Sequence, residues 1–153
     1  MRSVEPWVVE PLNAFLSESS ARLALIMTGS GQVIAQHGFT RAIDVMSTAA
    51  LGAGIVASAQ ELARLMSWPP FTTVVHQGEK QGHYLCRFDM PVGTWIGLAV
   101  FGQETTVGLV QLFFSRLVTD LAAAAPRDAR PREVLPADFE RDLNASLRTL
   151  FGR

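Results

Sequence analysis

The sequence has little of what marks several classes of protein. It contains one cysteine, Cys86, and this excludes an internal disulfide. It has no surplus of basic residues, because 13 Lys and Arg stand against 14 Asp and Glu and the net charge is -1. A nucleic-acid-binding surface must neutralise phosphates with excess positive charge, so nucleic acid is not an expected partner.

Long apolar runs are also missing. No window holds the roughly 18 consecutive apolar residues that a membrane-spanning helix needs, and the run from Thr94 to Phe101 is short and flanked by glycine. The opening residues, MRSVEPWVVEP, carry acids and prolines where a signal peptide has an apolar segment. We therefore expect a cytoplasmic protein that does not insert into a membrane.

The length of 153 residues suits one domain with a short appendage. Apolar periodicity, glycine turns and prolines predict an α/β domain with the element order αββαβββα, in which a five-stranded antiparallel sheet lies between helices. The expected helices are 5–19, 44–66 and 105–124, and the expected strands are 22–28, 32–37, 71–77, 82–88 and 93–101.

The strand patterns also predict positions in the sheet. Residues 93–101 are apolar on both alternations, as expected of an interior strand that is covered on both faces. Residues 71–77 alternate apolar with polar side chains, which is more typical of an edge strand. An exposed edge can pair with another chain.

The long helix 44–66 has one apolar stripe and an opposite face of mostly small residues. Leu51, Ile55, Leu62, Leu65 and Met66 share one stripe, which we expect to lie on the sheet. The opposite face holds Ala49, Ala50, Ala53, Ala57, Gln60 and Arg64. Small side chains allow another backbone to approach closely, so this face is a candidate contact surface; alternatively, the alanines only raise helix propensity on a solvated face.

The C-terminal part is expected to be a separate segment. Prolines and arginines in residues 125–136 are typical of a linker after a domain spanning 1–124. Residues 137–153 predict an amphipathic helix with Phe139, Leu143, Leu147 and Leu150 on one stripe. A helix this short needs a surface to lie on, either a partner or the protein's own body.

The sequence gives little support for a catalytic site. Strand alternation places His83 and Cys86 on opposite faces of their strand, so they cannot form a base and nucleophile pair. His37, His76 and His83 lack the close spacing typical of metal ligands. The turn Gly29-Ser30-Gly31 has no following lysine and helix, so it is not a phosphate loop. We expect no catalytic residue, no metal and no cofactor.

The order of elements, the small-residue helix and two short motifs resemble the roadblock (dynein light chain) family. The motifs are His76-Gln77-Gly78-Glu79 with Tyr84, and Thr106-Val107-Gly108-Leu109-Val110. Over about Trp7 to Leu121 the chain is most similar to MglB-type regulators of the Ras-like GTPase MglA. The resemblance implies a homodimer whose sheets join through the strand that starts at Phe71, and whose long helices contribute to binding one GTPase.

The resemblance further implies a role for particular residues. The implied dimer interface contains Ala49, Phe71, Thr73, Val75 and Gln77. The implied partner-binding residues are Ala50, Ala53, Ala57, Gln60, Glu61, Arg64, Phe139, Leu143 and Leu147. Glu61 departs from the pattern, since a small residue would suit a tight groove. The implied activity is stimulation of GTP hydrolysis without a donated arginine finger; a scaffold that binds without changing hydrolysis is the alternative.

Overall fold

The computed structural model describes residues 6–39, 41 and 43–126. The predicted order αββαβββα is confirmed, with element bounds close to those expected. The elements are α1 Pro6–Ser19, β1 Leu23–Thr28, β2 Val33–Gly38, α2 Val45–Leu65, β3 Thr73–Gln77, β4 Gly82–Met90, β5 Gly93–Phe101 and α3 Val107–Ala124. The predicted C-terminal helix, residues 137–153, lies outside the described residues.

The strands form one antiparallel sheet with the order β2-β1-β5-β4-β3. The apolar strand β5 lies at its centre, between β1 and β4, as its sequence predicts. The alternating strand β3 lies at one edge, where it pairs with β4 alone among the described strands. Both predictions about strand position are confirmed.

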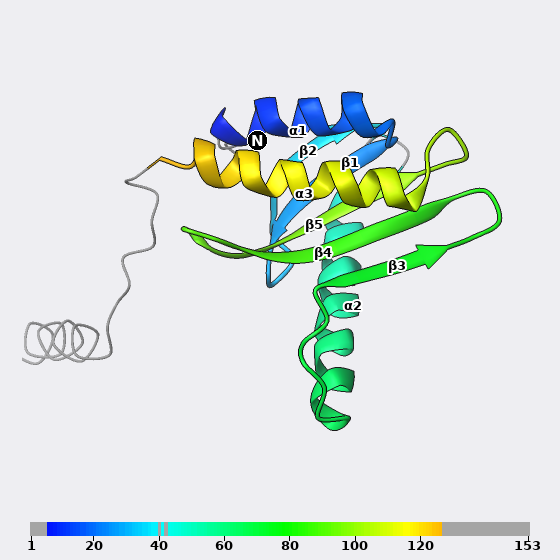
Figure 1. Ribbon diagram of the computed structural model, residues 1–153, viewed down its shortest axis with the longest axis vertical. Coiled ribbons are helices and arrows are strands. Elements are labelled where there is room, and N and C mark those ends of the chain that lie inside the picture. The colour runs from blue at the N-terminus through cyan, green and yellow to red at the C-terminus, as the bar shows by residue number, and fades with distance from the viewer. Residues whose placement is uncertain (1–5, 40, 42, 127–153) are drawn as a thin grey trace, which may run out of the picture.

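Helices cover both faces of the sheet (Figure 1). Helices α1 and α3 lie side by side on one face, and α2 crosses the other. Strand β4 shows how the alternation divides the core, because Tyr84 and Phe88 pack towards α1 and α3 whereas Leu85 packs towards α2. The domain is therefore built from three layers around two apolar cores.

The core beneath α1 and α3 is rich in aromatic contacts. The ring of Phe114 on α3 packs edge-to-face against Phe15 of α1 and Phe88 of β4. Trp7 stacks on Trp95 with their centroids 5.5 Å apart. Aromatic pairs in these geometries stabilise a core beyond the contribution of their buried area. The core beneath α1 and α3 is also the larger of the two.

Helix α3 is the one helix among the described residues whose length and composition would also allow it to cross a membrane. A core helix of a water-soluble domain has a similar composition. Val110, Phe114, Leu117 and Leu121 recur on one stripe of α3 and are buried against the sheet and α1. The apolar composition of α3 is therefore accounted for by its position in the core.

Helix α2 is oriented differently from the sequence prediction. Its buried residues are the small ones, Ala49, Gly52, Ala53, Val56 and Ala63, whereas Leu51 is 70% and Leu65 68% exposed. The expectation that the leucine stripe faces the sheet is therefore wrong. A Cβ atom at Gly52 would lie 3.3 Å from both Leu85 and Leu98, which shows how closely the helix backbone approaches the strands.

Candidate functional site

The exposed stripe of α2 is the most conspicuous surface feature of the described residues. Large apolar side chains recur along it at helical spacing, and Leu62 and Met66 are about half exposed. The members of this stripe, called the outer stripe below, are Leu51, Leu62, Leu65 and Met66, together with Ile55, which is half-buried against the core beneath α2. Exposed apolar residues that gather on one surface mark an interaction site, whereas scattered ones do not.

The start of α2 is fixed by a polar cap. The Asp44 carboxylate accepts a hydrogen bond of 3.1 Å from the backbone N–H of Ser47, as an N-cap residue does. This hydrogen bond lowers the pKa of Asp44, so its negative charge at neutral pH faces the positive end of the helix. The first turn of α2, which adjoins the sheet, is thereby anchored.

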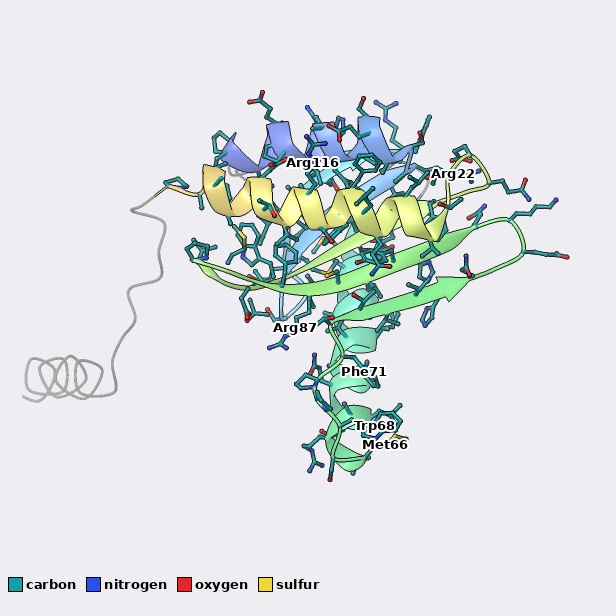
Figure 2. All side chains as sticks on the ribbon, viewed as in Figure 1. Arg22, Met66, Trp68, Phe71, Arg87 and Arg116 are labelled. Atoms are coloured by element: carbon teal, nitrogen blue, oxygen red, sulfur yellow. The ribbon has the colours of Figure 1, made fainter. Side chains whose placement is uncertain are left out.

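The second half of α2 extends beyond the sheet (Figure 1). Residues 66–72 return along this half, and Gln60 Nε2 donates a hydrogen bond of 2.8 Å to the carbonyl of Phe71. Figure 2 shows Met66 and Trp68 at the end of α2 farthest from the sheet, with Phe71 nearer to it. Since Trp68 is 55% exposed, this end presents aromatic and aliphatic area to solvent.

The β3 edge adjoins this surface. Thr73 is half-buried, Val75 and Gln77 are exposed, and Phe71 immediately before the strand is half-buried. Among the described residues, one side of β3 bonds to β4 and the other has no strand beside it. Unpaired backbone donors and acceptors on such an edge can accept a strand from another chain.

The structure separates the small residues that were expected to form one contact face. Ala49 is 0% exposed and Ala53 is nearly as deeply buried, both against the sheet, so they cannot meet a partner while α2 stays in place. Their assignment as interface residues is corrected for this reason. Ala50 and Ala57 are exposed and remain candidates.

Glu61 and Arg64 lie on the same exposed side of α2 as Ala57. The Arg64 guanidinium donates from Nε to the Glu61 carboxylate at 3.0 Å, and its Nη2 atom makes a second contact with this carboxylate. The hydrogen bond lowers the pKa of Glu61, which is ionised at neutral pH. The other partner-binding residues predicted from the sequence, Phe139, Leu143 and Leu147, lie outside the described residues.

A shallow groove of about 200 Å³ runs between the first half of α2 and the sheet. Its walls are mostly apolar because Leu85, Leu98 and Val100 form the floor and Leu51 and Ile55 the rim. Thr48 and His83 are the polar residues that line it. The groove opens beside the outer stripe, so the two belong to one surface.

Two features relevant to catalysis can now be placed. Burial raises the pKa of the Cys86 thiol, which packs on the α1 and α3 side of the sheet, away from His83. A thiol held in its neutral form is a poor nucleophile. His76 and His83, by contrast, lie opposite each other on β3 and β4, which sequence spacing alone did not reveal. The length of the turn between β3 and β4 decides which residues face each other, so it is the sequence signal that pairs these two histidines.

Comparison with known proteins identifies the family to which this architecture belongs. The model of the Roadblock/LC7 domain matches residues 8–89. The chain belongs to the Roadblock/LC7 family. A search of curated proteins found no match.

Solved structures of MglB are similar to the chain throughout the described domain. Myxococcus xanthus MglB is 26% identical with a TM-score of 0.69, and the match covers 76% of this chain and 92% of that one. The gliding protein MglB of Thermus thermophilus is 30% identical with a TM-score of 0.69, covering 82% and 93%. An MglB with a tetrameric arrangement is also 30% identical, with a TM-score of 0.68 and the same coverage. Within the Roadblock/LC7 family, the chain is MglB-like.

Proposed function

We propose that this protein is a cytoplasmic GTPase-activating regulator of a small Ras-like GTPase of the MglA type, and that it acts as a homodimer. The similarity to MglB over nearly the whole length of those proteins carries the proposal. The outer stripe of α2 and the open β3 edge support it, since a regulator without a catalytic site must act through its surfaces. In this proposal the protein is not itself an enzyme.

The homodimer is proposed to form through the β3 edge and α2. Pairing of two β3 strands would satisfy the backbone groups that β3 leaves open, through the segment that contains Phe71, Thr73, Val75 and Gln77. The outer stripe of one copy would then pack near that of the other. Full burial of a leucine contributes about 1.5–3 kcal/mol, so a stripe of this size supplies a substantial driving force.

The GTPase is proposed to dock on the exposed side of α2 that contains Ala50, Ala57, Gln60, Glu61 and Arg64. The two alanines have no long side chain to keep a partner's backbone at a distance, and burying them costs almost no side-chain entropy. Gln60 is half-buried and its amide is already bonded to Phe71. The C-terminal residues Phe139, Leu143 and Leu147 are proposed to add a second contact with the GTPase.

The activation is proposed to proceed without a donated arginine finger. Phosphoryl transfer spreads negative charge over oxygens that a correctly placed cation must meet. Arg64 on α2 is paired with Glu61, and this pairing offsets its charge and restrains its side chain. The cation would therefore come from the GTPase itself, whose active site the dimer rearranges.

A scaffold that binds a GTPase or another protein without changing hydrolysis is the second candidate. Glu61 favours it, because this carboxylate adjoins Ala57 in a place where close docking would suit a small residue. A negative charge there changes which partner surface fits best. The two candidates share the same surface and differ in its effect on the partner.

Single-turnover GTP hydrolysis distinguishes the two candidates. The Ras-like GTPase of the same genome is loaded with GTP and followed with and without an excess of this protein. We expect an acceleration of at least about tenfold, which corresponds to about 1.4 kcal/mol off the barrier. Binding with an unchanged rate would support the scaffold, and the absence of both would leave only the fold in common.

A further inference from the structure

His76 and His83 form an isolated pair on the edge of the sheet. They are direct cross-strand neighbours on β3 and β4. The turn between the strands holds this register, because the backbone N–H of Gly78 donates a hydrogen bond of 2.7 Å to the carbonyl of Gln81. The His76 Nδ1 atom lies 3.3 Å from His83 Nε2, and the ring centroids are 5.3 Å apart with the planes at 70°.

The two nitrogens are within hydrogen-bond distance, and their separation also equals that of two imidazole nitrogens bound to one metal ion. Zinc binds imidazole nitrogens at about 2.0–2.1 Å in tetrahedral geometry, so two such nitrogens stand about 3.3–3.4 Å apart. We propose that His76 and His83 are a two-histidine binding site for a borderline divalent ion of the zinc and copper class. Imidazole nitrogen is a preferred ligand of these ions, whereas Mg²⁺ and Ca²⁺ prefer oxygen.

The surroundings of the pair suit this role. His76 is exposed at the sheet edge, so an ion can reach the site from solvent. His83 is half-buried directly opposite His76 on β4. A metal binds the neutral imidazole through its free lone pair, so binding should be tested at neutral rather than acidic pH.

The site is open on its outer side. Within the described residues no third His, Cys, Asp or Glu joins the two histidines to complete a cluster. The remaining coordination positions are then left to water or to a ligand from another molecule. Such a site binds its ion less tightly than a closed structural zinc site, and it joins β3 to β4 at the edge of the sheet. This inference does not depend on the proposed GTPase.

The test uses full-length protein without a purification tag, titrated with Cu²⁺ and with Zn²⁺ at neutral pH. We expect one ion per chain by calorimetry and nitrogen coordination in the Cu²⁺ electron paramagnetic resonance spectrum. Because each histidine supplies one of two ligands, His76→Ala and His83→Ala should each lose about tenfold or more in affinity, or about 1.4 kcal/mol. His76 is exposed, so its replacement should leave the fold intact.

The chain offers two matched controls. His37→Ala removes the third histidine, which is exposed on β2, and should leave the affinity unchanged. Cys86→Ser removes the single thiol on the other side of the sheet and should also leave it unchanged. The proposal is overturned if the wild-type protein binds neither ion, or if His76→Ala binds as tightly as wild type. Loss of binding in Cys86→Ser alone would equally overturn it.

Discussion

The ring of Phe114 lies against the backbone of Gly97, so closely that a Cβ atom on Gly97 would stand 2.0 Å from Cζ of the ring. Gly97 is in the middle of β5, the central strand, and Phe114 is on α3. The absence of a side chain at this one position lets the ring reach the strand. The height of α3 above the sheet therefore depends on a single glycine.

Gly97→Ala should destabilise the domain by about 1–3 kcal/mol, because overpacking a well-filled core forces side chains or backbone to shift. Urea unfolding followed by circular dichroism measures this change. Gly54→Ala is the matched control, since a Cβ atom there would meet nothing within 4 Å and alanine favours a helix interior over glycine by about 0.5–1 kcal/mol. Equal stability of Gly97→Ala and wild type would show that α3 can move away from the strand without cost.

Leu65→Asp should convert the proposed homodimer into a monomer. The side chain of Leu65 is 68% exposed on the outer stripe, so a charge costs little in the monomer but is buried in the proposed interface. Analytical ultracentrifugation measures the change in mass. Leu112→Asp, a similarly exposed leucine on α3, should stay dimeric. A wild-type protein that sediments as a monomer would contradict the proposed interface.

Ala57→Arg should abolish binding of the GTPase while the fold stays intact. Ala57 is exposed, so the variant folds, but a long charged side chain keeps a partner's backbone away from the helix. Interferometry with the GTPase loaded with a GTP analogue measures affinity, and Ala122→Arg on the exposed side of α3 serves as the control. An affinity equal to that of wild type would place the docking surface elsewhere.

Tyr84 should lose its proton only at strongly alkaline pH. Burial raises its pKa from 10.0 to about 12. Between these values the unfolded chain releases the proton and the folded chain retains it, so stability falls as the pH rises from 10 towards 12. Tyr84 is the single tyrosine, so tyrosinate absorbance at its characteristic ultraviolet band reports on it alone.

The tyrosinate midpoint should coincide with about pH 12, or with unfolding if the domain unfolds first. Circular dichroism measured in parallel separates these two cases. Tyr84→Phe should lose the absorbance change together with its part of the alkaline instability. A midpoint near 10 with intact secondary structure would mean that solvent reaches the ring.

The sequence was sufficient for the elements and for the order of layers. Alternation in residues 71–77 and continuous apolarity in 93–101 predicted an edge strand and a central strand, because each pattern directly reflects how many faces are covered. Glycine and proline supplied the boundaries. These signals are local, so they can be read from the sequence without knowledge of the tertiary contacts.

The orientation of α2 could not be read in the same way. Both of its stripes are apolar, one made of leucines and one made of alanines and glycine, and periodicity does not say which stripe meets the chain's own sheet. The bulkier stripe was expected to lie on the sheet. Close approach at Gly52 and Ala53 decided otherwise, and close approach depends on the shape of Leu85 and Leu98 across the gap.

The pairing of His76 with His83 was within reach of the sequence. A turn over residues 78–81 sets Gln77 opposite Gly82 and therefore His76 opposite His83. Spacing along the chain does not reveal the pair, because strand partners are related by the turn and not by a fixed interval. Register, once inferred, is the better guide to sites in hairpins.

The second half of α2 stands clear of its own sheet (Figure 1), and this has a consequence for how the protein acquires its stability. Among the described residues, those that accompany this half are 66–72, and in the proposed homodimer a second molecule buries its remaining apolar area. Folding and assembly are then linked by mass action. The melting temperature should then depend on protein concentration, because a dilute solution contains more of the less stable monomer and a concentrated one more of the dimer.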